Sequence, residues 1–185
     1  VFLINLERRN DRLSFMNYKL TTININYKLI KAVDGNNIFN EFTSLNKSYP
    51  HSINSPGALA LKNTWIKLLK TCIDKNHKRI LILEDDVYFH KNFNNLLDKS
   101  KNIFNNFDIV NLGGNQHNWL PDQEKQINTN NYYNYAKLMY TYGTYGISLN
   151  KKAIQVIYDE LLNTVKPKFI DVEINNLITS NKISG

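Results

Sequence analysis

Apolar residues follow two kinds of pattern along this chain, short continuous runs and runs at helical spacing. A continuous apolar run bounded by charged or turn residues is typical of a strand buried on both faces. Apolar residues three and four positions apart indicate a helix with one buried face. The expected strands are 1–6, 27–33, 79–84, 108–112 and 143–149, and the expected helices are 9–20, 56–72, 91–102 and 150–163.

These strands and helices alternate along the chain, with polar irregular stretches at 36–55 and 115–134. Alternation of this kind predicts an α/β fold, with a mostly parallel central sheet and helices on both faces. The 185 residues correspond to a single domain, long enough to bury a core. Because the sequence opens directly in an apolar run without Met, we expect a domain excised from, or truncated relative to, a longer protein.

Composition and charge narrow the classes of partner. The net charge of +7 fits an anionic ligand such as a nucleotide diphosphate as well as it fits a polyanion. The basic residues are scattered, with no run of five or more, so no nucleic-acid partner is expected. Cys72 is the only cysteine, which excludes an internal disulfide and a cysteine metal cluster. No segment approaches the ~20 apolar residues of a membrane span.

Three consecutive carboxylates, Glu84, Asp85 and Asp86, follow the strongly apolar strand ILIL. In open α/β sheets, ligands bind at the carboxyl ends of the strands. Clustered carboxylates are costly to bury unless a cation compensates them. Alternation along a strand puts Glu84 and Asp86 on one side, where they would suit Mn²⁺ or Mg²⁺. The alternative is a solvated strand end whose acids cap the next helix.

Charged residues also follow the first and second strands. Arg8, Arg9 and Arg12 could bind phosphate, because a guanidinium is always charged and can donate two hydrogen bonds at once. Asp34 could hold a ribose or a base. The alternatives are a solvated first helical turn for the arginines and an ordinary turn residue for Asp34.

The region after the fourth strand offers three further candidates. Asn111 and Gly113 lie where the backbone could approach a ligand closely, although a plain loop is the alternative. His117 lies in the polar stretch and could be a third metal ligand, whereas a lone loop histidine is more often simply exposed.

Six segments in order resemble motifs of glycosyltransferase family 25, which contains bacterial lipooligosaccharide galactosyltransferases and collagen hydroxylysine galactosyltransferases. The opening segment resembles INL-x-R-R-x-D-R of the family, and ILILEDDVYF is similar to its LVLEDD strand, a variant of the D-x-D metal motif. The six segments are INLERRNDR (4–12), KAVDG (31–35), PGALALKNTW (56–65), ILILEDDVYF (80–89), DIVNLGG (108–114) and GTYGISLNKKA (143–153).

The resemblance implies a GT-A-type, Rossmann-like fold and transfer of galactose or glucose from a UDP-sugar with inversion. It also implies Mn²⁺ or Mg²⁺ and a glycan or hydroxylysine acceptor, as in lipopolysaccharide biosynthesis or collagen glycosylation. In this picture Glu84 and Asp86 hold the metal and Asp85 touches the sugar or ribose. Arg12, with Arg8 or Arg9, lies near the nucleotide, and the uridine is bound by Asp34.

Inversion requires a base that deprotonates the acceptor hydroxyl. Asp171 resembles a late aspartate of the family and is the first candidate, with Glu173 second. An acid at a helix N-terminus is the alternative for Asp171. The Ser-His of the family is replaced by Leu61 and Lys62, so Lys62 would have to substitute for the histidine at the donor.

Three other functions stay open at this stage. A non-catalytic glycosyltransferase-like module of a larger protein would bind nucleotide sugar without turnover, and the replaced Ser-His favours it. A metal-dependent phosphoryl-transfer enzyme could use the same acidic strand end, but the chain lacks a G-x-x-x-x-G-K-[ST] loop. The interpretation as a nucleic-acid-binding protein is supported only by the net charge and the tyrosine content, and it ranks last.

Overall fold

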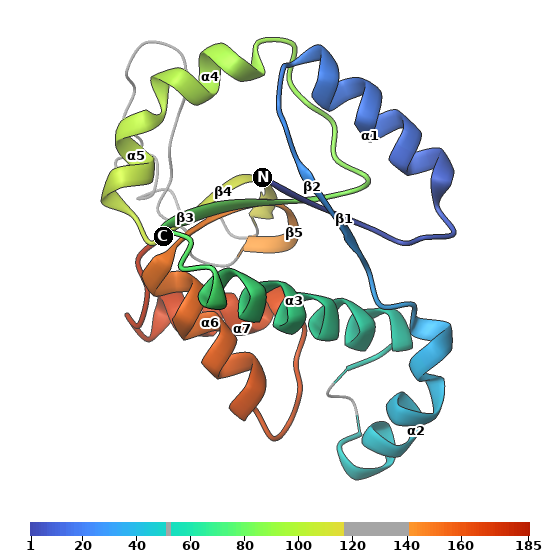
Figure 1. The fold of residues 1–185 in the computed structure, drawn as a ribbon. Coiled ribbons are helices and arrows are strands. Elements are labelled where there is room, and N and C mark those ends of the chain that lie inside the picture. The colour runs from blue at the N-terminus through green and yellow to red at the C-terminus, as the bar shows by residue number, and fades with distance from the viewer. Residues whose placement is uncertain (51–52, 117–140) are drawn as a thin grey trace.

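A computed structural model describes residues 1–50, 53–116 and 141–185 of the chain (Figure 1). The elements are β1 (Phe2–Asn5), α1 (Asn10–Thr22), β2 (Lys28–Lys31), the 3-10 helix η1 (Gly35–Ile38), α2 (Phe39–Ser48), α3 (Pro56–Asp74), β3 (Arg79–Glu84), α4 (Phe93–Lys99), α5 (Lys101–Asn106), β4 (Ile109–Gln116), β5 (Thr141–Asn150), α6 (Lys151–Asn163) and α7 (Ile170–Thr179).

The central sheet has five strands in the order β2-β1-β3-β5-β4. Strand β1 pairs in parallel with β2 and with β3, whereas β5 is antiparallel to both of its neighbours, β3 and β4. The predicted α/β fold with a Rossmann-like, mostly parallel sheet is therefore confirmed. The reversed direction of β5 brings its first residues to the edge where β1, β2 and β3 end.

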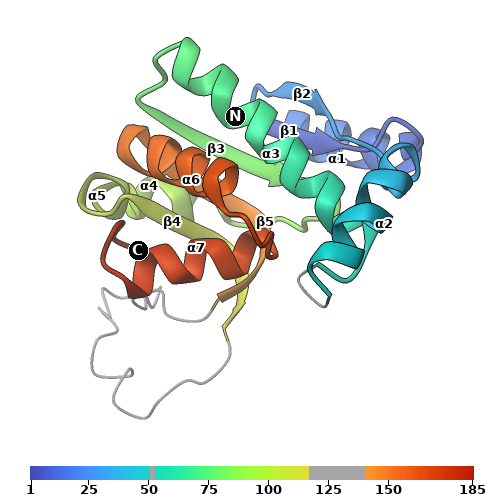
Figure 2. The same ribbon diagram turned by 90° about the horizontal axis from the view of Figure 1, so that it is seen from below.

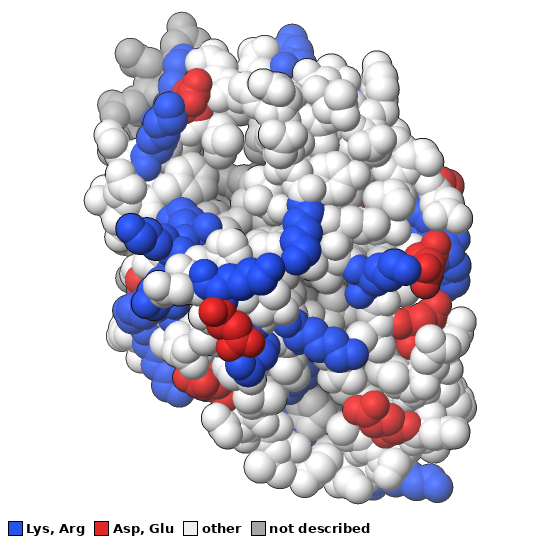
Figure 3. All heavy atoms as spheres, viewed as in Figure 1, with Lys and Arg blue, Asp and Glu red and all other residues white. Residues whose placement is uncertain are grey.

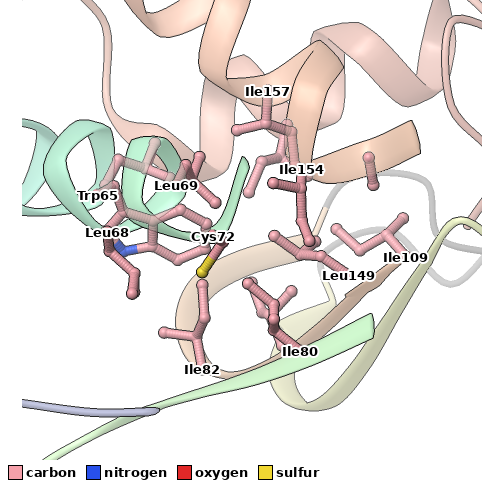
Figure 4. Packing of buried hydrophobic residues seen from close by; sticks show 14 of the residues in the cluster. Trp65, Leu68, Leu69, Cys72, Ile80, Ile82, Ile109, Leu149, Ile154 and Ile157 are labelled. Carbon is pink, nitrogen blue, oxygen red and sulfur yellow. The ribbon is translucent and has the colours of Figure 1, made fainter. Parts of the chain in front are cut away.

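Helices cover both faces of this sheet, as predicted (Figures 1 and 2). Helices α3, α6 and α7 lie on one face, and α1, α4 and α5 lie on the other. The larger hydrophobic core lies beneath α3, α6 and α7, where Trp65 and Cys72 of α3 pack with Ile82 of β3 and Ile157 of α6 (Figure 4). A smaller cluster on the opposite face centres on Leu3.

Side-chain caps define the starts of two long helices. Ser55 accepts a hydrogen bond from Ala58 N at 3.2 Å, and Pro56 occupies the first turn of α3, where its missing N–H costs nothing. Asn150 accepts from Ala153 N at 2.9 Å at the start of α6. Both helices begin within one residue of their predicted starts.

Three segments differ from the sequence-based expectation. The stretch 36–55, expected to be irregular, contains η1 and α2, whose side chains are exposed or half-buried and so give a weak apolar period. The single helix expected at 91–102 is two short helices that meet at Ser100. Helix α7 follows the last predicted helix and buries four apolar side chains, Ile170, Ile174, Leu177 and Ile178.

Basic side chains cover more of the face shown in Figure 3 than acidic ones do, in line with the net charge of +7. They are interspersed with acids and uncharged residues. Among the helices that the structure describes, none combines the length and apolarity needed to cross a membrane.

Candidate active site

The three carboxylates at the end of β3 lie at the edge of the sheet where β1 and β2 also end. Strand β3 ends at Glu84, so the alternation of side chains does not extend to Asp85 and Asp86. A single nitrogen of Arg12 contacts both aspartates, while Glu84 contacts β5 instead. These contacts do not decide whether Glu84 and Asp86 face the same side, so their pairing at a metal stays a prediction, while both line the same cavity.

Asp85 is the most firmly held of the three carboxylates. Asn5 Nδ2 donates to Asp85 Oδ2 at 2.7 Å, and Arg12 Nη1 donates to Asp85 Oδ1 at 2.8 Å. Asp85 and Asn5 are both buried. Because both oxygens of Asp85 have a protein donor, this residue fixes the end of β3 against β1 and α1.

Asp86 is the carboxylate most open to a ligand. Its Oδ2 accepts from Arg12 Nη1 at 3.1 Å, and its side chain is 40% exposed. Arg12 is thus shared between two negative charges. Donation from one cation leaves the pair of aspartates with an excess of negative charge.

Glu84 accepts a hydrogen bond from the Thr144 hydroxyl of β5. Burial raises the pKa of the Glu84 carboxyl, and the nearby charges of Asp86, Asp85 and Asp171 raise it further. The antiparallel register, with Leu83 opposite Gly146, brings Thr144 to this position. A cation near Glu84 would lower the cost of its ionised form.

A second ion pair lies beside the acidic cluster. Arg8 Nε donates to Asp34 Oδ2 at 2.9 Å, and Asp34 Oδ1 accepts from Asn36 N at 3.0 Å, which caps η1. The backbone bond from Asn36 and the guanidinium of Arg8 lower the pKa of Asp34. Asp34 therefore orders the turn after β2, as the turn interpretation expects, while remaining at the site.

These two groups share a cavity of about 290 Å³. At Gly35, the backbone of the cavity wall packs closely against the start of α3. A Cβ on Gly35 would lie only 2.9 Å from Gly57 N and from the carbonyl carbon of Pro56, so a larger residue would not fit there. The lining residues are Ile4, Asn5, Leu6, Arg8, Arg12, Ala32, Val33, Asp34, Gly35, Asn36, Pro56, Gly57, Ala60, Leu61, Glu84, Asp85 and Asp86.

Arg9, Asn111 and Gly113 are not among the residues that line this cavity. Arg9 pairs with Asp11 at 2.7 Å. Asn111 and Gly113 line a separate groove on the other face of the sheet, which also reaches Asp86. His117 lies outside the described residues.

Asp171 is in the first turn of α7, the position that the alternative interpretation gives it. Its Oδ2 accepts from Gly143 N at 3.0 Å, and its Oδ1 accepts from Val172 N at 2.8 Å. Gly143 has a φ of +88°, and a Cβ there would lie 2.2 Å from the Tyr145 ring. Each carboxylate oxygen keeps a second lone pair, so Asp171 can still accept a proton.

Glu173 and Lys62 are both buried, away from the cavity lining. Burial lowers the pKa of the Lys62 ammonium, and the charges of Glu173 and Glu160 offset part of that shift. Burial raises the pKa of Glu173, with Lys62 and Lys168 acting against it. Glu173 Oε1 has no hydrogen-bond partner among the described residues. The charges of these two side chains, one on α3 and one on α7, therefore affect each other's ionisation.

A divalent metal fits this site by chemistry, though with fewer protein ligands than expected. In residues 1–50, 53–116 and 141–185, no three His, Cys, Asp or Glu side chains are placed to hold a metal ion together. The ligands on offer are the carboxylates of Glu84 and Asp86, hard oxygen donors of the kind that Mg²⁺ and Mn²⁺ prefer. The negative charges of Asp85 and Asp86 disfavour ionisation of Glu84, and a bound cation would offset this repulsion.

Two residues of the site were missed from the sequence, Asn5 and Thr144. Asn5 lies within the apolar segment INL, so the sequence pattern did not single it out. Its side chain donates a hydrogen bond to Asp85. Thr144 lies in the GTYG segment, where its contact with Glu84 depends on the direction of β5. A buried polar residue at a strand end was the available signal for both.

Comparison with known proteins places this arrangement in a family. The family model described as glycosyltransferase family 25 (LPS biosynthesis protein) matches residues 1–166. The chain belongs to glycosyltransferase family 25. Its acidic strand end and its paired arginine and aspartate therefore lie on the scaffold of a glycosyltransferase family.

Two curated relatives of this glycosyltransferase chain are longer proteins. Procollagen galactosyltransferase 2 of Homo sapiens is 26% identical over 170 residues, which cover 84% of this chain and 26% of the human protein. "Putative glycosyltransferase R655" of Acanthamoeba polyphaga mimivirus is 33% identical over 106 residues, covering 54% of this chain and 32% of the viral protein. The chain spans about a quarter to a third of the length of these relatives.

Proposed function

We propose that this chain transfers galactose or glucose from a UDP-sugar to a saccharide or hydroxylysine hydroxyl, with inversion and with Mn²⁺ or Mg²⁺. The observation that carries the proposal is the acidic triplet beside the 290 Å³ cavity, with Arg8 and Arg12 in the same lining. The name of the human relative supports galactose and a procollagen-type acceptor. The family description supports a saccharide acceptor.

The donor would occupy the cavity lined by both arginines. Arg8 and Arg12 would pair with the diphosphate, and Asp34 and Asp85 would face the nucleoside and the sugar. Glu84 and Asp86 would hold the metal, which when bound would stabilise negative charge on the departing diphosphate. The arginines would add to that stabilisation from fixed positions on α1 and the preceding turn.

The acceptor oxygen would attack the anomeric carbon from the side opposite the diphosphate. A new carbon–oxygen bond forms, the bond from the anomeric carbon to the phosphate oxygen breaks, and UDP leaves with the electron pair. Asp171 would take the hydroxyl proton, and its bond from Gly143 N would hold the carboxylate in place. Glu173 is the second candidate, although its burial beside Lys62 favours a supporting role.

A non-catalytic nucleotide-sugar-binding or structural module is the second candidate function. The observation that favours it is the buried Lys62, which lies outside the lining of the cavity where it would have to substitute for the family histidine. This module would bind the same donor without turnover.

The proposal is tested by thermal unfolding of the chain with UDP, with Mn²⁺ and with both, before and after Asp86→Asn. A ligand specific for the folded state stabilises it by about 2.7 kcal/mol at a hundred times its dissociation constant. We expect the two ligands together to raise the midpoint well beyond either alone, and Asp86→Asn to abolish that synergy. Hydrolysis of UDP-galactose and UDP-glucose then separates an enzyme from a silent binder.

Asp159→Asn provides the matched control, because it makes the same change at an exposed position on α6. The synergy should survive in this variant. Absence of any shift with UDP and Mn²⁺ in the unmodified chain would overturn the donor-site proposal. Synergy without hydrolysis or transfer would favour the non-catalytic module.

A further inference from the structure

A second, larger hollow of about 550 Å³ lies between the helix pair α4–α5 and strands β3, β4 and β5. It is on the face of the sheet opposite α3, where Figure 1 places α4 and α5. Its walls are mainly aliphatic and aromatic, with contributions from Leu83, Phe93, Leu96, Leu97, Ile103 and Val110. This apolar groove is distinct from the donor cavity, which lies at the ends of β1, β2 and β3.

The groove and the donor cavity share one lining residue, Asp86. Tyr88 and Tyr145 also line the groove and are 87% and 43% exposed, so they mark its open side. A molecule that extends from the groove past Asp86 would therefore reach the place where the proposed transfer occurs.

Three polar side chains that line the groove already have a partner in the protein. Asn111 Oδ1 accepts from Gly113 N at 3.1 Å, Ser100 Oγ donates to Leu96 O at 2.8 Å, and His90 Nδ1 accepts from Asn92 N at 3.1 Å. A sugar ring placed here would bury several hydroxyls with few free partners, which is costly. A hydrocarbon chain would meet no such cost.

The size of the groove also points to an apolar occupant. Protein interiors are packed to crystal density, and voids larger than a water molecule are few. A hollow lined by Leu, Ile and Phe attracts apolar ligands rather than ordered water. Its volume is in the range of small-molecule sites, about 300–1,000 Å³.

We propose that this groove binds the hydrocarbon portion of an amphipathic acceptor, whose hydroxyl-bearing head lies at Asp86. The inference rests on the proposed function, because it supplies the acceptor side of that same reaction. The exposed Tyr88 and Tyr145 suit the boundary between the two parts, since a tyrosine ring has an apolar body and a polar tip.

The test uses n-octyl β-D-glucoside, kept below its micelle-forming concentration, and methyl β-D-glucoside as probes of the metal-free and donor-free chain. Binding is measured by calorimetry, with hexyl and heptyl glucosides between the two. We expect affinity to rise about fourfold for each added methylene that the groove buries. Equal binding of the methyl and octyl compounds would overturn the proposal, because the head alone would then be recognised.

Two variants locate the binding. Leu97→Asn makes the wall of the groove polar, and Leu97→Trp fills its space while keeping it apolar. Both should lower octyl-glucoside affinity at least tenfold. Leu162→Asn, at a position 52% exposed on α6 across the sheet, makes the same polar change away from the groove and should leave affinity unchanged. Loss of affinity in Leu162→Asn equal to that in the Leu97 variants would overturn the proposal.

Stabilisation by UDP with Mn²⁺ is measured on the same samples. It shows that the variants are folded, and it keeps the two proposals separate. If UDP with Mn²⁺ still stabilises the protein but glucoside affinity does not depend on alkyl-chain length, the groove proposal alone is wrong. If glucoside affinity rises with alkyl-chain length but UDP with Mn²⁺ does not stabilise the protein, the donor-site proposal is wrong and the groove remains an apolar ligand site.

Discussion

Arg12 is the residue on which the charge balance of the site depends. It reaches Asp85 and Asp86 through one nitrogen, at 2.8 Å and 3.1 Å. Asp85 has a second donor in Asn5, whereas Arg12 is the donor that contacts the Asp86 carboxylate. Arg12 therefore keeps two like charges together, and in the proposed donor complex it would meet a phosphate.

Arg12→Gln should lower the free energy of unfolding by about 1–2 kcal/mol, because it leaves a buried carboxylate without its cation. The value lies below that of a fully buried pair, since the Arg12 side chain is 36% exposed and water screens it. Urea unfolding measures the loss.

Arg8→Gln is the control for Arg12→Gln. The Arg8 side chain is 58% exposed, so breaking its pair with Asp34 should cost less. Equal losses in the two variants would contradict the view that Arg12 compensates a buried charge while Arg8 does not.

Strand β5 and helix α7 are joined by side-chain hydrogen bonds to the backbone of the strand. Asn175 of α7 accepts from Thr141 N at 3.2 Å and donates to Thr141 O at 3.0 Å, and Asp171 accepts from Gly143 N. These bonds tie the start of β5 to the helix that carries the candidate base. Thr144, which contacts Glu84, follows directly in the same strand.

Asn175→Leu should destabilise the fold by about 2–4 kcal/mol, because it leaves two buried backbone groups of Thr141 without partners. Chemical denaturation measures the change. Asn176→Leu makes the same substitution at the next, exposed position of α7 and should stay within about 0.5 kcal/mol. Similar losses at the two positions would show that β5 does not depend on the Asn175 amide.

Lys62 and Glu173 form a buried couple of interacting charges that joins α3 to α7, two helices far apart in the sequence. Lys62 is on α3 and Glu173 is on α7, and both are buried where other side chains are apolar. The couple stands near Glu160 and Lys168, whose charges also act on it. Its ionisation therefore bears on the stability of the whole fold.

The pH dependence of folding should reveal this couple. Because the pKa of Glu173 is raised in the folded protein, the folded state binds a proton more tightly than the unfolded state. Stability associated with Glu173 is thus present at low pH and is lost as pH rises from near 4.5 through the raised pKa. The unfolding free energy of Glu173→Gln, relative to the unmodified chain, should therefore increase with pH.

Urea unfolding from about pH 4 to about pH 8 measures this difference. The lowered pKa of Lys62 acts in the same direction, since loss of the Glu173 charge lets Lys62 release its proton more easily. Glu41→Gln on the exposed side of α2 controls for the chemical change. A difference that falls as pH rises would contradict a raised pKa of Glu173 in the folded protein.

The sequence by itself determined where the strands and most helices lie. Over a long segment, apolar residues that recur every 3.6 positions indicate a helix and are readily told from the alternating or continuous pattern of a strand. Helices α3 and α6 show this helical spacing. It also determined that Glu84, Asp85 and Asp86 follow a buried strand, and the motif order around them indicated the family that the comparison confirmed.

Only the tertiary structure decided which side chains meet at the site. Apolar patterns carry no strand direction, so the reversal of β5, and with it the contact of Thr144 with Glu84, depends on pairing between distant segments. The same holds for Arg12, which lies 73 residues from Asp85, and for Lys62, which burial beside Glu173 removes from the donor cavity. Local sequence sets local conformation, whereas hydrogen bonds and burial between distant residues set the geometry of a site.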